Sequence, residues 1–269
     1  MLEKIKNTAS FIRDKTGHAP ELGIILGTGL GGMVKDMEID TTLAYEDIPN
    51  FPVSTVDGHH GRLIFGSLGG KDIVAMQGRF HYYEGYNMAE VTFPVRVMKL
   101  LGIRSLIVSN ASGGVNPDFE VGDMMIMNDH INLLPNPLIG KNMDELGNRI
   151  VDMSEPYDPA MIEKAKQVAR DNNIKVQEGC YVATTGPTLE TPKEYEYFRI
   201  IGGDAVGMST VPEVIVARHM DLPVFAISVI TDLGVPGKIE KISHEDVQRA
   251  AEQVKPKLTA LIEKFIASI

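Results

Sequence analysis

The sequence contains almost no cysteine, no excess of positive charge and no long apolar run. Cys180 is the single cysteine in 269 residues, which excludes an internal disulfide and a cysteine-rich metal site. The net charge of −10 is the opposite of the basic surface that nucleic-acid binding needs. No stretch has the length of a membrane span, and the N-terminus lacks the apolar centre of a signal peptide. We therefore expect a cytoplasmic protein that binds neither nucleic acid nor membrane.

Internal repeats, low-complexity tracts and interdomain linkers are also absent from the sequence. Hydrophobic residues make up 43% of the chain, enough for a large core. Short apolar runs at residues 22–26, 72–76, 105–109 and 223–230 indicate buried strands, and helical patterns alternate with them. This alternation predicts an α/β fold, with residues 1–269 as a single domain.

Two capping boxes mark predicted helix starts. Asn87 and Glu90 have the spacing of one box, and Thr210 and Glu213 have the spacing of the other. The second box would place Ser209 directly before a helix N-terminus, where the helix dipole favours an anion.

A glycine-rich loop, GTGLGG at residues 27–32, follows the first predicted strand. It fits the dinucleotide pattern G-x-G-x-x-G, but no strong second parallel strand with an acidic ribose partner follows it. We therefore reject a nicotinamide site. The backbone N–H groups of the loop and the Thr28 hydroxyl remain suited to an anion. Residues 110–114, NASGG, predict a second small-residue loop that lets backbone approach a ligand.

The densest cluster of functional residue types is QGRFHYYEGY at residues 77–86. It follows the predicted strand at residues 72–76, and open α/β sheets place ligands at such strand ends. Arg79 offers a planar fork of donors that suits phosphate, and His81 adds a second donor. His59 and His60 form a pair, but nothing at metal-ligand spacing completes a site, so we expect no metal.

Polar groups recur at or just beyond the ends of the predicted strands: Thr28, His59, Arg79, His81, Ala111, Glu190, Ser209 and Asp232. Side-chain donors and two glycine loops indicate a phosphate site. The two carboxylates indicate a partner with N–H groups, such as a heterocycle, and the nearby tyrosines suit a sugar. An enzyme that joins phosphate, sugar and base fits all three.

Several of these motifs resemble those of the trimeric family that contains the purine nucleoside phosphorylases and methylthioadenosine phosphorylases. The resemblance covers almost the whole chain, in GTGLG (27–31), QGRFH (77–81), YEGY (83–86), NA (110–111), DHIN (129–132), Tyr181, GP (186–187), ET (190–191) and GMSTVPE (207–213). It implies one α/β domain with a central mixed β-sheet flanked by helices. It also implies a homotrimer without metal or organic cofactor, in which inorganic phosphate is a co-substrate.

The activity that the resemblance implies is phosphorolysis of inosine or guanosine to a free purine and ribose 1-phosphate, a step of purine salvage. The implied phosphate site is Thr28, His59, Arg79, His81, Ala111 and Ser209, and the implied ribose site is Tyr83, Met208, His244, Tyr181 and Leu146. The implied purine site is Leu189, Glu190, Val206, Gly207 and Asp232, and the implied catalytic residues are Glu190, Asp232 and His81.

Two positions depart from the usual pattern of the family. Leu146 stands where a phenylalanine usually covers the ribose of the neighbouring subunit, so nucleoside binding is expected to be weaker. Asp232 stands where the enzymes for 6-oxopurines usually carry asparagine. A carboxylate accepts from the 6-amino group of adenine, whereas Glu190 accepts from N1–H of hypoxanthine or guanine. We therefore expect inosine and guanosine as main substrates and measurable cleavage of adenosine.

Three alternatives remain. A methylthioadenosine phosphorylase would share the phosphate site, but the polar His244 argues against the apolar pocket that a thiomethyl group needs. A nicotinamide-dependent dehydrogenase rests only on the glycine pattern. A binding protein without catalysis would leave the carboxylate pair unused. An assay of inosine cleavage with and without phosphate separates these possibilities.

Overall fold

Nine strands form a single mixed sheet in this computed structural model, which describes residues 1–28, 31–53, 55 and 60–269. The strands in these ranges are β1 (Leu22–Leu26), β2 (Glu38–Ala44), β3 (Arg62–Leu68), β4 (Lys71–Gln77), β5 (Ser105–Gly114), β6 (Met124–Asn132), β7 (Gln177–Ala183), β8 (Ala205–Gly207) and β9 (Val224–Leu233). Their order is β2-β3-β4-β1-β5-β8-β7-β6-β9, and β5 also pairs with β9.

The additional pairing closes part of the sheet on itself. β5 pairs with β8, β8 with β7, β7 with β6, β6 with β9, and β9 again with β5. These strands form a closed ring, and β1, β4, β3 and β2 extend from it. Parallel and antiparallel pairs both occur, as expected for a mixed sheet. Because β4, β1, β5 and β9 run parallel to one another, their carboxyl ends meet at one edge.

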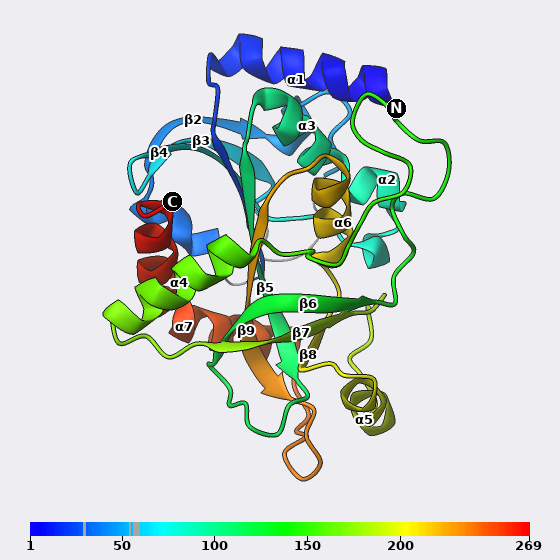
Figure 1. Ribbon diagram of the computed structural model, residues 1–269, viewed down its shortest axis with the longest axis vertical. Coiled ribbons are helices and arrows are strands. Elements are labelled where there is room, and N and C mark those ends of the chain that lie inside the picture. Colours follow the sequence, from blue (N-terminus) through cyan, green and yellow to red (C-terminus); the bar gives the residue numbers. More distant parts are fainter. Residues whose placement is uncertain (29–30, 54, 56–59) are drawn as a thin grey trace.

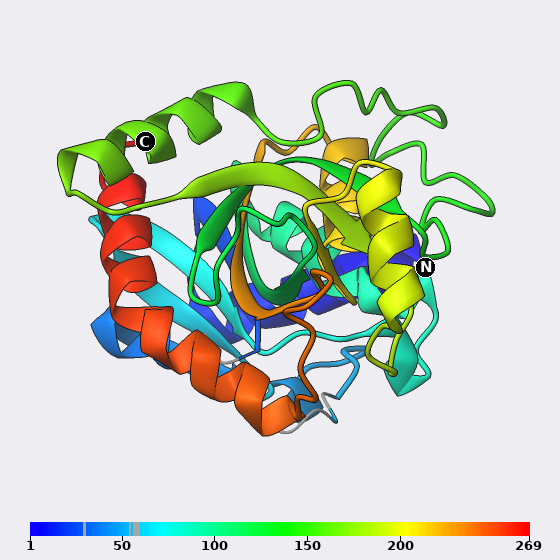
Figure 2. The same cartoon turned by 90° about the horizontal axis from the view of Figure 1, so that it is seen from below.

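Helices cover the sheet in Figure 1. They are α1 (Leu2–Thr16), α2 (Met88–Val91), α3 (Phe93–Leu101), α4 (Pro159–Asp171), α5 (Pro192–Ile200), α6 (Val211–His219) and α7 (His244–Ile266). α1 packs on α3, and α4 packs on α7, which also contacts β9. Figure 2 shows α4 and α7 along one side of the molecule and α5 on the other. None of the helices in the described ranges is long and apolar enough to cross a membrane.

Several helix boundaries agree with the local sequence signals. Asn87 and Glu90 form the predicted capping box at α2. α1 ends at Gly17, whose left-handed φ of 68° suits glycine. Asp158 caps α4 by accepting from the N–H of Met161 at 2.9 Å. Local sequence therefore determines where these helices begin and end.

The predicted loop at residues 110–114 is wrong. These residues continue β5, which pairs with β9 along one side and with β8 on the other. The small side chains that indicated a loop instead allow neighbouring groups to approach closely: a Cβ atom on Gly113 would lie 2.9 Å from Asp232 Oδ2. Pairing on both sides therefore outweighs the weak strand propensity of glycine.

The strand that follows the glycine loop, β2, was not predicted. It pairs antiparallel with β3 at the far edge of the sheet, whereas the parallel neighbours of β1 are β4 and β5. A dinucleotide fold needs a helix that leads directly from β1 to a second parallel strand. The topology therefore agrees with the rejection of a nicotinamide site.

Candidate active site

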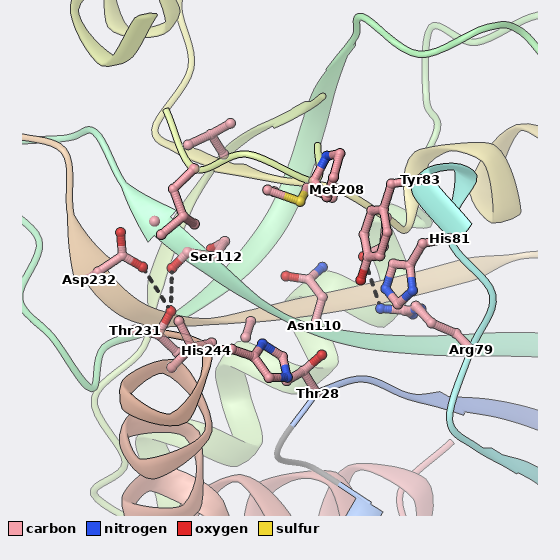
Figure 3. A pocket seen from close by; sticks show the side chains of 18 of the residues that line it. Thr28, Arg79, His81, Tyr83, Asn110, Ser112, Met208, Thr231, Asp232 and His244 are labelled. Carbon is pink, nitrogen blue, oxygen red and sulfur yellow. Dashed lines mark hydrogen bonds between the residues drawn. The ribbon is translucent and has the colours of Figure 1, made fainter. Parts of the chain in front are cut away.

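A cavity of 580 Å³ lies where the carboxyl ends of β1, β4, β5 and β9 meet (Figure 3). The predicted site residues that line it are Thr28, Arg79, His81, Tyr83, Ala111, Leu189, Glu190, Val206, Gly207, Met208, Ser209, Asp232 and His244. They come from segments up to 216 residues apart. This volume is typical of a small-molecule site.

Three predicted site residues are not part of this lining. His59 lies outside the described residues, so its role stays a prediction. Tyr181 is fully buried behind the cavity, and its hydroxyl lies 3.4 Å from the backbone N of Ser209. In this position Tyr181 supports Ser209 and does not face a sugar. Leu146 packs against the core of its own chain away from the cavity. Its predicted role concerns a neighbouring subunit and stays a prediction.

One end of the cavity, here called the donor end, carries Thr28, Arg79, His81 and Ser209. Arg79 is only 1% exposed, and its Nε donates to Glu213 Oε1 at 3.1 Å. Its Nη1 donates to Ser109 O at 2.9 Å and to Ser209 Oγ at 3.0 Å. A buried guanidinium that lines a cavity favours the binding of an anion there.

His81 is held in one orientation by Glu84. The backbone N and the Nδ1 of His81 lie 2.7 and 3.0 Å from Glu84 Oε1, and Thr55 donates to Oε2 through its N and Oγ1. Burial opposes ionisation of Glu84, but these hydrogen bonds outweigh it and lower its pKa to about 2. Burial lowers the pKa of His81. The His81 ring also stacks on Tyr83, with centroids 4.7 Å apart.

Ser209 is positioned by a strained turn at Thr210. Thr210 has φ 70° and ψ −55°, and the N–H of Val211 donates to Ser209 O at 2.8 Å, which defines a γ-turn. A β-branched residue rarely adopts positive φ, so this backbone is strained. Asn110 Nδ2 stabilises the turn by donating to Thr210 Oγ1 at 2.9 Å. The turn brings Ser209 Oγ to Arg79.

The capping box predicted at the start of α6 is wrong. Thr210 makes no side-chain cap bond, because the γ-turn directs its hydroxyl toward Asn110. The carboxylate of Glu213 extends to Arg79 instead of the N-cap backbone. The sequence spacing was compatible with a cap, but the buried guanidinium is the stronger partner for a carboxylate.

The middle of the cavity is lined by Asn110 and Met208, which Figure 3 shows between Arg79 and Asp232. Ser228 Oγ donates to Asn110 Oδ1 at 2.5 Å, so both ends of this amide have protein partners. Met208 packs over Gly186, where a Cβ atom would lie 2.2 Å from Met208 Sδ. The middle section is thus rigid and combines a polar wall with an apolar wall.

The opposite end, here called the carboxylate end, carries Glu190 and Asp232. β9 has one extra residue here: Ser112 pairs with Ile230, and Gly113 pairs with Asp232. Thr231 is the extra residue of this bulge, and both Thr231 and Asp232 line the cavity.

The surroundings of the two carboxyl groups raise their pKa values. Burial raises the pKa of Asp232, although hydrogen bonds from Thr231 and Tyr195 oppose this effect. Burial also raises the pKa of Glu190, and the nearby charge of Asp232 adds to it. Thr231 Oγ1 lies 3.0 Å from Asp232 Oδ1 and 3.2 Å from Ser112 O (Figure 3). A proton can therefore reside at this end more readily than on an exposed carboxylate.

Sequence reasoning missed several residues of the cavity. Asn110 and Glu84 lie inside recognised motifs, and their polar side chains next to the predicted ligand residues could have identified them. Thr231 lines the cavity at the bulge, which no local pattern indicated. Across the described part of the chain, no group of three His, Cys, Asp or Glu side chains is arranged to hold a metal ion.

Comparison with known proteins gives a consistent result. The family described as the phosphorylase superfamily matches residues 21–267. Purine nucleoside phosphorylase 1 of Bacillus subtilis is 49% identical over 268 residues, which cover 99% of both chains. Purine nucleoside phosphorylase of Rattus norvegicus is 48% identical over 277 residues, covering 99% of this chain and 95% of the rat protein.

Solved structures agree with the sequence comparison. A crystal structure of Schistosoma mansoni purine nucleoside phosphorylase in complex with adenosine superposes with a TM-score of 0.95 and 42% identity. It covers 99% of this chain and 97% of the other. A Schistosoma purine nucleoside phosphorylase in complex with hypoxanthine gives a TM-score of 0.94 at 42% identity, with 99% and 97% coverage.

Proposed function

Because the chain belongs to the phosphorylase superfamily, and within it to the purine nucleoside phosphorylases, we propose how its cavity cleaves purine nucleosides with phosphate. The reaction breaks the N-glycosidic bond and gives a free purine and ribose 1-phosphate. The observation that carries the proposal is the order of groups along the cavity: the donor end, the middle section and the carboxylate end. Phosphate, sugar and base follow one another in the same order.

Phosphate binds at the donor end. Arg79 and Ser209 are already hydrogen-bonded to each other, and His81 is fixed by Glu84, so these groups need little reorganisation when the anion enters. Thr28 supplies a hydroxyl, and Ala111 lies on β5 beside this end of the cavity. The charge of Arg79 makes it the principal phosphate ligand.

The ribose lies between the two ends, in contact with Tyr83, Met208 and His244. Bound phosphate attacks C1′ from the face opposite the base, the C1′–N9 bond breaks, and its electron pair leaves with the purine. The sugar passes through a state with oxocarbenium character, which the phosphate anion stabilises. Removal of one preorganised donor in such a site costs about 10²–10³ in rate.

The purine lies at the carboxylate end, against Leu189, Val206 and Gly207. As the base departs it gains negative charge and takes up a proton at N7. The raised pKa values of Glu190 and Asp232 support this role, because they keep a proton accessible at this end. Glu190 and Asp232 are therefore the proposed residues for stabilisation of the leaving group.

Both classes of purine nucleoside are proposed as substrates. Glu190 accepts a hydrogen bond from N1–H of a 6-oxopurine, whereas ionised Asp232 accepts one from the 6-amino group of adenine. Each mismatch leaves a buried group unpaired at about 1–3 kcal/mol, so neither base is strongly rejected. The similar Schistosoma structures, one with adenosine and one with hypoxanthine, support this proposal. Inosine and guanosine remain the main proposed substrates.

A homotrimer is the proposed assembly. The irregular segment between β6 and α4 exposes large apolar side chains: Ile139 is 79% exposed and Ile150 is 85% exposed. Both line a second cavity of 480 Å³ together with Leu138 and Met153. Such surface on a monomer favours contact with another subunit. The same segment carries Leu146, which would reach the neighbouring ribose. A cytoplasmic location also stays a prediction.

The test is an assay of inosine cleavage with and without phosphate, with identification of the sugar product. Cleavage should require phosphate and give ribose 1-phosphate. Arg79→Ala should reduce kcat/KM by about 10²–10³-fold and raise the KM for phosphate, because it removes the main charge at the donor end. Equal cleavage in phosphate-free buffer would indicate a hydrolase and refute the proposal.

A further inference from the structure

Tyr195 lies directly behind the carboxylate end and does not line the cavity. It belongs to the second turn of α5, and its ring is 5% exposed. Its hydroxyl lies 3.4 Å from Asp232 Oδ2, and the negative charge of Glu190 also raises the pKa of the phenol. The phenol therefore lies close to both carboxylates of the site.

The phenol can serve these carboxylates only as a donor. Burial and the two nearby negative charges raise the pKa of Tyr195, so its hydroxyl stays protonated throughout the range in which enzymes are assayed. A protonated phenol donates one hydrogen bond to an ionised carboxylate and favours the ionised form.

Asp232 is fixed from several sides. Thr231 Oγ1 contacts Oδ1 at 3.0 Å, and the Tyr195 hydroxyl contacts Oδ2 at 3.4 Å. Gly113 provides the space beside the carboxylate, since a Cβ atom there would lie 2.9 Å from Oδ2. The orientation and charge of Asp232 therefore depend on Tyr195 as well as on the bulge.

We propose that Tyr195 is a positioning residue that sets base specificity: its hydroxyl holds Asp232 ionised and oriented as a hydrogen-bond acceptor, which lets the cavity accept 6-aminopurines. The inference rests on the proposed function, in which the purine faces Glu190 and Asp232. Tyr195 acts through Asp232 and does not touch the base.

Removal of the Tyr195 hydroxyl should change the pKa of Asp232 in one direction. Without this donor the ionised form of Asp232 loses a stabilising contact, so the pKa of Asp232 rises further. A protonated carboxyl donates a hydrogen bond, which suits the 6-oxo group of inosine and not the 6-amino group of adenosine. The other titratable groups near Asp232 are Glu190 and, across the cavity on α7, His244. Both are present in the variant, so they do not reverse the direction.

The experiment compares Tyr195→Phe with the matched control Tyr197→Phe, on the same helix and 50% exposed. Steady-state kcat/KM for inosine and adenosine is measured from pH 5.5 to 9, together with the KM for phosphate. Tyr195→Phe should raise the inosine-to-adenosine ratio about five- to ten-fold, the effect of about one lost hydrogen bond. The acid limb of the adenosine profile should move to higher pH, whereas the KM for phosphate should not change. Tyr197→Phe should alter none of these quantities.

The same assay in an Asp232→Asn background distinguishes the possible failures. If the inference is correct, Tyr195→Phe no longer changes the ratio there, because asparagine has no charge to maintain. If Asp232→Asn changes the ratio but Tyr195→Phe lowers kcat/KM for both nucleosides equally, Tyr195 is only structural and the inference is overturned. If Asp232→Asn leaves the inosine-to-adenosine ratio unchanged, Asp232 does not contribute to base specificity. Its proposed contact with the base then fails together with the inference.

Discussion

Glu213→Gln tests whether the buried ion pair beneath the donor end holds the phosphate site together. Glu213 and Arg79 have side chains only 4% and 1% exposed, and Nε and Oε1 lie 3.1 Å apart. Glu213 stands in the first turn of α6, 134 residues from Arg79 in the sequence. Glutamine keeps the size of the side chain and removes its charge, so the change isolates the electrostatic contribution.

The expected loss of stability in Glu213→Gln follows from the burial of both partners of the ion pair. Removal of one partner from a buried pair costs about 3–5 kcal/mol, because the remaining charge loses its compensation. The hydrogen bonds from Arg79 to Ser109 and Ser209 persist, which places the expected loss near the lower value, about 3 kcal/mol. Each kcal/mol shifts Tm by about 2–4 °C in a chain of roughly this size, so a decrease of about 6–12 °C is expected.

Calorimetry with and without phosphate measures this effect. The anion replaces the missing negative charge beside Arg79, so saturating phosphate should raise Tm more in Glu213→Gln than in the unmodified protein. Glu196→Gln is the control, since it breaks an exposed pair with Lys193 on α5 and should leave Tm unchanged. A Tm of Glu213→Gln within 2 °C of the unmodified protein, with the same gain from phosphate, would refute the reasoning.

Three further predictions concern the base and the neighbouring subunit. Asp232→Asn should raise the inosine-to-adenosine ratio of kcat/KM by about ten-fold or more, because an asparagine amide can donate to a 6-oxo group and 1.4 kcal/mol corresponds to a factor of ten. An unchanged ratio would contradict the role of Asp232. Leu146→Phe should lower the KM for nucleosides, because a ring covers more of the sugar than leucine does. Light scattering should give the mass of a trimer at assay concentrations, and a monomer would contradict the shared site.

Local sequence predicted the parts of the fold that depend on neighbouring residues. The box at Asn87 and Glu90 and the end of α1 at Gly17 follow from contacts within four residues, and both were correct. The glycine-rich segment 110–114 was predicted as a loop, since propensity could not reveal that β8 and β9 pair on either side of it. Tertiary pairing outweighs propensity in such segments.

The candidate site likewise contains residues that could be predicted from the sequence and residues that could not. Residues in recognisable motifs, such as Arg79 just after β4 and Ser209 just after β8, could be predicted because polar groups beyond strand ends commonly line ligand sites. Glu213 could not be assigned, since its partner is remote in sequence and its spacing from Thr210 fitted a helix cap equally well. Thr231 lies at a bulge, which alternation along the strand does not reveal.

The bulge at Thr231 has a consequence for changes in chain length. Because side chains alternate along a strand, an insertion or a loss beside the bulge that shifts the register by one residue would turn the residues on one side of it to the opposite face. Asp232 would then lose its place beside Gly113 and Tyr195. Substitutions at these positions alter one contact at a time, whereas a single insertion or deletion would rearrange the whole carboxylate end. This stretch of β9 should therefore tolerate exchange of residues far better than any change in their number.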